Sequence, residues 1–227
     1  MEVKELVWDS AFFNKKIGEI NLLKNEKAVA DKIFDLIIVK QPSDDDVKLA
    51  GYEWSYTETK IVFEKTLKRL NDIDESGIQD TDHCAKNIDF FKELAYESGQ
   101  NSRFLLDPNF GEALFKKLYD EWIINSLNKK FAIKIFFVEK ENQAIGFITL
   151  QKDGQVGKIG LIATHPKFQG QGIGKKLLKF AENYCFDRSL TKLEIPTQKQ
   201  NVQACKFYEK QGYVLNKELI IKHFWRK

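Results

Sequence analysis

Apolar residues in the second half of the chain recur at spacings that alternate between those of helices and those of strands. Apolar residues three or four positions apart predict helices, and short apolar or alternating runs predict strands. Helices are expected at 89–96, after Asp107-Pro108-Asn109 with an apolar face of Ala113, Leu114, Leu118, Trp122 and Ile123, at 175–188 and at 202–211. Strands are expected at 131–140, 144–151, 159–163, 191–196 and 219–225. This order of elements is typical of an α/β (α+β) domain.

The first 70 residues predict a smaller α/β unit. Strands are expected at 7–10, 17–20, 36–39 and 54–67, and a helix at 26–34. Ser43 and the three aspartates after it predict a helix start, where a capping hydroxyl and negative charge are favourable. The acidic stretch 71–83 has no aromatic residue and predicts a linker. We therefore expect an N-terminal unit at 1–70, a linker at 71–86 and a larger domain at 87–227.

Composition narrows the class of protein. The chain has 227 residues, 43% of them hydrophobic, and a net charge of only +3, which argues against disorder and against a basic nucleic-acid-binding surface. Cys84, Cys185 and Cys205 are widely spaced, so neither a metal site nor a disulfide framework is expected. The N-terminus is unlike a signal peptide, and no apolar run has the length of a membrane span. A cytoplasmic protein with reduced thiols is the expectation.

A glycine-rich loop joins the strand at 159–163 to the helix at 175–188. The strand leads into Thr164-His165-Pro166, and three glycines then follow at alternate positions: Gly170, Gly172 and Gly174. Glycine lets the backbone approach a ligand closely, and the first N–H groups of a helix have no acceptor within it. Such a loop predicts an anion site, in particular for phosphate. An ordinary glycine-rich turn is the alternative, and the flanking strand, the helix and Gln169 make it the weaker one.

Two nucleotide-binding motifs fit this loop poorly. A P-loop requires Ser or Thr after Gly-Lys, but Gly174 is followed by two lysines. The dinucleotide fingerprint requires a third glycine three residues after the second, and Leu177 stands there. Lys175, Lys176 and Lys179 place positive charge beside the loop, which suits either an anionic ligand or a solvated helix face.

The pattern Gln169-x-x-Gly172-x-Gly174, with Asn201 and Tyr208 downstream, resembles the acetyl-CoA site of the GNAT superfamily of N-acyltransferases. The resemblance implies a mixed, mostly antiparallel sheet whose two central strands splay apart, flanked by helices. It also implies acetyl-CoA as co-substrate and direct attack by an amine in a ternary complex, with no metal. Such sheets have exposed edge strands, which are compatible with a homodimer.

The resemblance also implies roles for individual residues. Backbone groups of the splayed strand suit pantetheine and the thioester oxygen: Ile162, Ala163 and Thr164. The loop would hold the pyrophosphate: Gln169, Gly170, Gln171, Gly172, Ile173 and Gly174. Asn201 and Phe207 would contact the cofactor, and Tyr208 would protonate the leaving thiolate. Asn201 and Tyr208 are seven positions apart, so two helical turns place them on nearly one face. A buried core tyrosine is the alternative for Tyr208.

The acceptor is suggested by a likeness to one subgroup, which acetylates the 4-amino group of TDP-fucosamine, a TDP-linked amino-dideoxy sugar. The likeness rests on segments 6–20, 102–110, 119–123, 197–201 and 222–226. Ser102 and Arg103 lie between two predicted helices, where acceptors of this family often bind. Arg103 suits a diphosphate or an ion pair with Asp107.

Other functions and the proton acceptor stay open at this point. Another small amine, a protein or peptide amine, and a CoA-binding module without activity are the alternative functions. No nucleophile with an adjacent base is evident, which fits direct attack. The general base is not singled out among three carboxylates: Glu58, Asp107 and Glu194.

Overall fold

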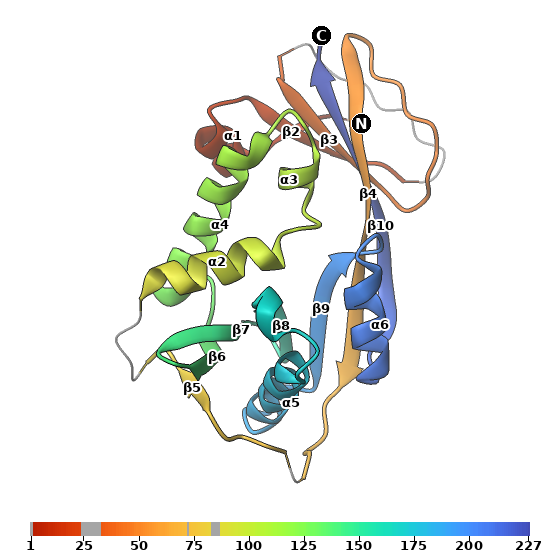
Figure 1. The fold of residues 1–227 in the computed structure, drawn as a ribbon. Helices are drawn as coiled ribbons and strands as arrows, with labels where there is room; N and C mark the ends of the chain where they lie inside the picture. The colour runs from red at the N-terminus through yellow and green to blue at the C-terminus, as the bar shows by residue number, and fades with distance from the viewer. Residues whose placement is uncertain (1, 24–32, 72, 83–86) are drawn as a thin grey trace.

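The computed structural model describes residues 2–23, 33–71, 73–82 and 87–227, and Figure 1 shows its helices beside a single mixed sheet. The strand order is β1-β2-β3-β10-β4-β9-β8-β7-β6-β5. The strands are β1 (Lys4–Glu5), β2 (Ile17–Asn21), β3 (Leu36–Gln41), β4 (Tyr52–Thr66), β5 (Ile78–Asp80), β6 (Lys134–Lys140), β7 (Gln143–Asp153), β8 (Val156–Thr164), β9 (Lys192–Gln198) and β10 (Val214–Arg226). The helices are α1 (Val7–Phe13), α2 (Ile88–Ser98), α3 (Arg103–Leu106), α4 (Gly111–Leu127), η1 (Pro166–Phe168), α5 (Ile173–Phe186) and α6 (Val202–Lys210).

The strands of the first 70 residues belong to the same sheet as the C-terminal strands. β4 lies between β9 and β10 and pairs with β10 from Tyr52 to Glu64. β3 pairs with the other edge of β10. Among the described strands only β2–β3 and β8–β9 pair in parallel, so the predicted mixed, mostly antiparallel sheet is confirmed.

β8 and β9 separate after a short contact. They pair only where Val156–Lys158 meets 192–194, and beyond this point each strand continues without the other. A bulge in β8 lies opposite Thr149, whose hydroxyl accepts the Leu161 N–H (2.8 Å). The sheet therefore has an opening between its central strands, as the sequence resemblance implied.

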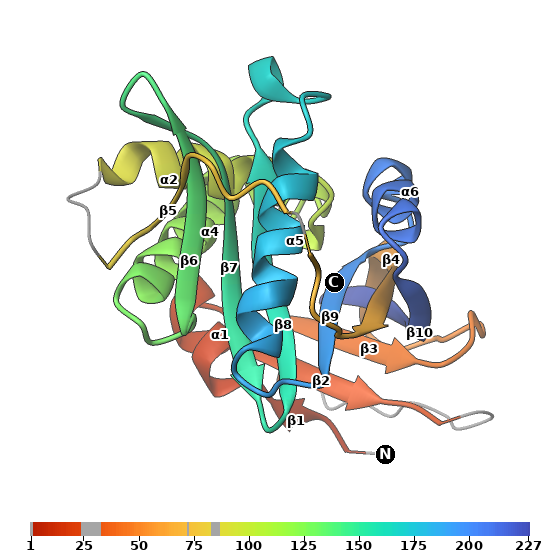
Figure 2. The ribbon, with the colours of Figure 1, turned by 90° about the horizontal axis from the view of Figure 1, so that it is seen from below.

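Helices cover both faces of the sheet. α2, α3 and α4 pack on one face through a core that includes Phe91, Phe115 and Phe147. α5 and α6 lie against the other face, apart from each other, as Figure 2 shows. β3 is buried on both sides, which explains why its sequence is a continuous apolar run.

Most predicted strands and helices are confirmed, and the exceptions have local causes. Residues 7–10 form part of α1 and not a strand, because Phe13 packs into the core and Asn14, at φ +50°, ends a helix. No helix begins at Ser43, whose hydroxyl bonds to Asp45 Oδ2 (2.6 Å) in an extended loop. The acidic stretch contains β5, which pairs with β6. The helix expected at 26–34 falls mainly outside the described residues.

Candidate active site

The loop between β8 and α5 presents backbone N–H groups that point to no acceptor in the described chain. Gly170 (φ +76°) and Gly172 (φ +82°) adopt left-handed conformations that suit glycine, and a Cβ at either would meet no atom within 4 Å. α5 begins at Ile173, and Lys176 N donates to the Gly172 carbonyl (2.9 Å). The N–H groups between Gly170 and Lys175 donate to no other described residue. A loop and helix start of this kind suit a phosphate.

Gln169 shapes this loop through contacts inside the protein. Its side-chain amide donates to Glu97 Oε1 on α2 (3.0 Å) and to the Thr164 carbonyl (3.2 Å). Its N–H donates to the Pro166 carbonyl (3.3 Å). The Gln169 side chain therefore fastens the loop to α2 and to the end of β8, while Gln171 is exposed.

Two backbone N–H groups of β8, those of Ile162 and Thr164, point toward the opening between β8 and β9. Leu161 N donates to the Thr149 hydroxyl and His165 N to the Ile145 carbonyl (2.9 Å), so these N–H groups face β7. Because N–H directions alternate along a strand, those of Ile162 and Thr164 face the opposite side, from which β9 has diverged. The N–H of Ala163 faces β7, so the three predicted residues are not equivalent.

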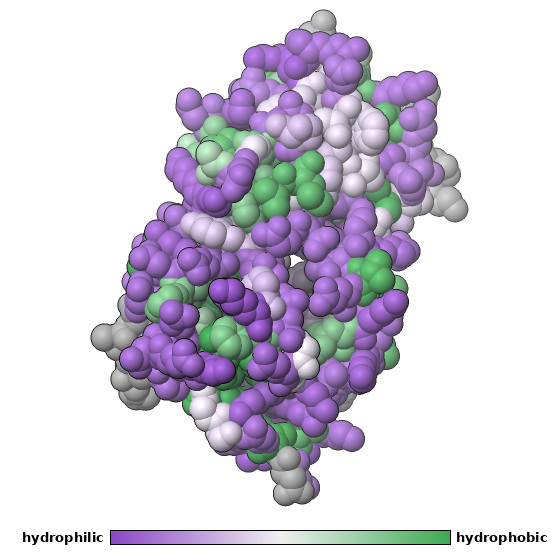
Figure 3. Space-filling model, viewed as in Figure 1, coloured by the Kyte–Doolittle hydropathy of each residue, from purple (hydrophilic) through white to green (hydrophobic). Residues whose placement is uncertain are grey.

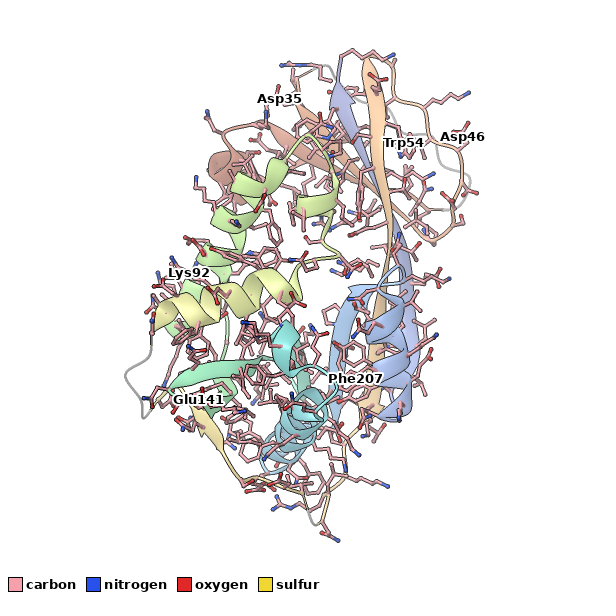
Figure 4. The ribbon with its side chains drawn as sticks, in the orientation of Figure 1. Asp35, Asp46, Trp54, Lys92, Glu141 and Phe207 are labelled. Carbon is pink, nitrogen blue, oxygen red and sulfur yellow. The ribbon has the colours of Figure 1, made fainter. Side chains whose placement is uncertain are left out.

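Tyr208 lies on α6 in the core beneath the opening. It is 5% exposed, and its ring centroid lies 5.8 Å from that of Phe63 and 5.3 Å from that of Phe207. Burial raises the pKa of Tyr208 far above its ordinary value, so the phenol is neutral. Its hydroxyl has no hydrogen-bond partner among the residues described. Phe207, labelled in Figure 4, reaches the loop, since a Cβ on Gly174 would lie 3.6 Å from its ring.

The other predicted residues of α6 have structural contacts. Asn201 caps the helix, because its side-chain oxygen accepts the Ala204 N–H (3.2 Å). Only the NH₂ of that amide remains for a ligand. Cys205 is half-buried, with Sγ 3.7 Å from the Gln198 carbonyl, and burial raises the pKa of its thiol. Cys205 therefore packs, partly buried, against the core between the sheet and its helices.

A basic pocket adjoins the loop. It has a volume of about 250 Å³ and is lined by Ile73, Asp74, Gly172, Lys175, Lys176 and Lys179. Lys176 pairs with Asp74 at 2.7 Å, so its charge is partly compensated. The lysines that the sequence placed beside the loop are thus next to Gly172, where an anionic ligand would meet them.

A buried polar cluster lies on the opposite face of the sheet, under α3. Arg103 Nη1 donates to Glu58 Oε1 (3.2 Å), and His223 Nδ1 lies 2.7 Å from Asp107 Oδ2. Trp225 Nε1 also donates to this carboxylate (2.9 Å). Glu58, Asp107 and His223 are at most 1% exposed. The ion pair suggested for Arg103 and Asp107 is wrong, because the partner of Arg103 is Glu58.

Burial and hydrogen bonding set the charges of this cluster. Burial opposes ionisation of Asp107, but hydrogen bonds from His223 and Trp225 outweigh it and lower the Asp107 pKa to about 2. Burial lowers the pKa of His223 despite its carboxylate partner. His223 is therefore neutral near pH 7, with Nδ1–H donating to Asp107 and Nε2 able to accept. Ser102, the other predicted acceptor residue, is buried and caps α3 by accepting the Phe104 N–H (3.2 Å).

Figure 3 shows a hollow in the middle of this view of the molecule, between α2 and α3 on one side and β4 and β9 on the other. Mostly hydrophilic residues surround it. Among the described residues, no group of three or more His, Cys, Asp or Glu side chains is arranged to hold a metal ion. No helix in the described ranges is long and apolar enough to cross a membrane.

The chain is similar in sequence to two bacterial proteins. It is 30% identical over 135 residues to the spore coat polysaccharide biosynthesis protein SpsD of Bacillus subtilis. The matched segment is 59% of this chain and 46% of SpsD, so the chain spans about half the length of that relative. It is 25% identical over 219 residues to the dTDP-fucosamine acetyltransferase of Escherichia coli O6:H1, with 92% of each chain covered.

Solved structures show the same fold. A GNAT-family protein from Novosphingobium aromaticivorans superposes with a TM-score of 0.56 at 12% identity, covering 89% of this chain and 77% of its own. The PaiA N-acetyltransferase of Thermoplasma acidophilum, solved in complex with coenzyme A, superposes with a TM-score of 0.52 at 19% identity. The match covers 64% of this chain and 97% of PaiA. Residues 100–213 match the acetyltransferase (GNAT) family. The chain therefore belongs to the acetyltransferase (GNAT) family and is an acetyl-CoA-dependent N-acetyltransferase.

Proposed function

We propose that this enzyme acetylates the 4-amino group of a TDP-linked amino-dideoxy sugar by direct attack in a ternary complex. The observation that carries the proposal is the likeness to dTDP-fucosamine acetyltransferase, which covers 92% of both chains and so extends into the strands before residue 71. SpsD, by its name a protein of polysaccharide biosynthesis, also favours a sugar acceptor.

Three groups of residues would handle the cofactor. The N–H groups of Gly170–Lys175 would hold the pyrophosphate, and those of Ile162 and Thr164 would receive pantetheine and the thioester oxygen. Acetyl-CoA supplies an acetyl group on a thiol leaving group. Tyr208, neutral and with an uncommitted hydroxyl, would protonate that thiolate.

The acceptor would bind on the face that carries α3. There the chain offers a carboxylate, a guanidinium and an imidazole in a buried setting, which suits a polar amine better than an apolar one. Arg103, with a side chain 20% exposed, is the solvent-facing member of its ion pair and could meet a diphosphate. Ser102 would act there indirectly, by fixing the start of α3.

The proposal is tested by measuring thiol release from acetyl-CoA with a panel of acceptors. dTDP-4-amino-4,6-dideoxygalactose should give the highest kcat/KM, above free amino sugars, polyamines and peptides. A peptide or polyamine as the best acceptor would replace the proposed substrate with one of those classes. CoA binding without turnover on any acceptor would point to a module that lacks activity.

A substitution in the loop tests the pyrophosphate site. Gly172→Ala should raise the Kd for CoA about tenfold or more, because a non-glycine residue at φ +82° costs about 1–2 kcal/mol and would shift N–H groups that bind a charged ligand. Isothermal calorimetry with CoA measures this.

Gly154→Ala is the matched control for that substitution. Gly154 has φ +57° and no atom within 4 Å of an added Cβ, but it lies in the β7–β8 hairpin at the other end of β8. Both variants should lose a similar few degrees of Tm, while only Gly172→Ala should weaken CoA binding. Equal Kd values in the two variants would remove the loop from the cofactor site.

A further inference from the structure

Three side-chain polar atoms in the described residues are individually shielded from solvent and have no hydrogen-bond partner, and all three belong to the polar cluster under α3. They are Glu58 Oε2, Arg103 Nε and His223 Nε2. A buried polar atom without a partner costs free energy, so native proteins rarely leave one, and three together indicate a place for a polar ligand or water. The cluster is therefore more than a structural ion pair.

The position of Glu58 relates this cluster to the opening in the sheet. On β4, Lys60 pairs with Gln198, the last residue of β9, and Glu58 lies two residues further along on the same face as Lys60. Glu58 thus borders the open end of β9, on the face opposite Ile61, which packs in the core that holds Tyr208. A group between Glu58 and the opening would have the carboxylate on one side and the strands that would hold the thioester on the other.

The other two candidate carboxylates are less suitable as bases. Asp107 already accepts several hydrogen bonds, and Glu194 does not lie at the opening. Asp107 is occupied, since His223, Trp225, Ser55 and Asn109 all bond to it. Glu194 lies where β8 and β9 still pair, opposite Lys158, and so lies outside the opening. Glu58 is the remaining carboxylate of the three, and it alone carries a buried oxygen without a partner.

We infer that Glu58 binds the ammonium group of the acceptor and takes its proton. This inference rests on the proposed function, the acetylation of an amine by direct attack. Arg103 is the resting partner, held by one 3.2 Å hydrogen bond, and it is more exposed than Glu58. An incoming ammonium can replace this guanidinium as counter-ion. His223 Nε2 and Arg103 Nε would then serve neighbouring hydroxyl groups, as acceptor and donor respectively.

The step balances as follows. One proton of the ammonium passes to Glu58 Oε2, and the freed nitrogen forms the bond to the acetyl carbon. The carbon–sulfur bond breaks, and the Tyr208 hydroxyl gives its proton to the departing sulfur. The second proton lost by the nitrogen restores Tyr208, and Glu58 releases its proton to water. One proton is released for each amide formed.

Several ionisable groups face Glu58 and shape its pH response. Tyr56 and Lys60 are its neighbours on β4, His223 is on β10, Tyr119 is on α4, and Arg103 and Asp107 belong to α3 and its end. Glu19 and Lys40, on β2 and β3, act on Lys60. Burial, with a smaller contribution from the Glu58 carboxylate, raises the pKa of Tyr56. Burial and then Arg103 lower the pKa of Lys60. None of these groups except Glu58 and His223 offers a buried acceptor atom without a partner.

Glu58→Gln in the full-length enzyme tests the inference, with dTDP-4-amino-4,6-dideoxygalactose or otherwise the best acceptor of the panel. The amide keeps the shape and the hydrogen bond to Arg103 but is not a base. We expect kcat/KM for the amine at pH 7 to fall about 100-fold or more, with an unchanged Kd for CoA. Between pH 6 and 8 the variant should gain about tenfold per pH unit, since only amine already deprotonated reacts, whereas the wild type should change little.

Two further variants complete the experiment. Glu64→Gln is the matched control, because Glu64 is on the same strand and face but pairs with Lys192 (3.1 Å) away from the opening, and it should behave as wild type. Glu58→Asp keeps a carboxylate and should retain the flat pH profile at a lower rate. Wild-type kcat/KM and pH profile in Glu58→Gln would overturn the inference while the proposed function stands. A wild-type enzyme inactive on every amine would overturn both.

Discussion

Tyr208→Phe is expected to lower kcat about 100-fold or more while leaving the Kd for acetyl-CoA within about twofold. The phenol is buried and neutral, and its hydroxyl has no partner among the described residues, so removing the oxygen deletes a proton donor without breaking a bond of the fold. For the same reason the Tm should hardly change. Steady-state kinetics, CoA calorimetry and a thermal scan separate these three quantities.

Tyr184→Phe is the matched control for that change. Tyr184 is on α5, with its ring 4.9 Å from Phe136 and the Arg188 guanidinium over it at 3.5 Å, near the end of the helix that lies away from the loop. Loss of its hydroxyl should leave kcat, Kd and Tm close to wild type. If Tyr208→Phe and Tyr184→Phe gave the same kcat, Tyr208 would be a core residue and another group would protonate the thiolate.

The conformation of the loop and helix of the candidate cofactor site could be predicted from sequence because its signals are local. Gly170 and Gly172, at φ +76° and +82°, are followed directly by an amphipathic helix, so the whole signal lies in consecutive residues. Asn201 caps the short helix that carries Tyr208, so their spacing places them relative to each other. The spacing did not reveal two hydrogen bonds within the protein. The Gln169 side-chain amide donates to Glu97 on α2, and the Asn201 side-chain oxygen accepts the Ala204 N–H as a helix cap.

Two predicted elements were wrong because competing local interactions decide them. Val7 and Trp8 favour a strand by propensity, but both are exposed in a helix that brings Phe13 into the core. The acidic run after Ser43 suits a helix start, yet Asp44 pairs with Lys222 on β10 (2.8 Å). In both cases a tertiary contact outweighs a weak local preference.

Glu58, Arg103 and Asp107 were singled out in the sequence, but their arrangement around His223 in the candidate acceptor cluster could not be predicted, because these residues are far apart in sequence. Glu58, Arg103, Asp107 and His223 come together only because β4 inserts between β9 and β10 while α3 packs above them. No periodicity indicates that a strand from the first 70 residues occupies that place. His223 carries no sequence signal at all, since an isolated histidine in an apolar strand is more often a core residue.

The same insertion of β4 creates a largely buried ion pair that joins α5 and α6. Lys65, on β4, donates to Glu182 Oε2 on α5 (2.8 Å) and to the Gln211 carbonyl at the end of α6 (2.9 Å). Tyr213 donates to the other oxygen of Glu182 (3.0 Å). The Glu182 side chain is 2% exposed, so its charge depends on these partners. The pair thus connects α5, which follows the candidate phosphate-binding loop, with α6, which carries Tyr208.

Lys65→Met should therefore destabilise the enzyme by about 3–5 kcal/mol, since it leaves the Glu182 carboxylate buried without its cation. For a chain of this size the Tm should fall by roughly 6–20 °C in a thermal scan. Lys192→Met is the control: that lysine also pairs with a glutamate, Glu64, but its side chain is 43% exposed, and its loss should cost at most about 1 kcal/mol. Adding Glu182→Gln to Lys65→Met should recover part of the loss, because a neutral amide is less costly to bury than an unpaired carboxylate. Equal Tm values for the two lysine variants would show that the Lys65 pair does not hold α5 and α6 together.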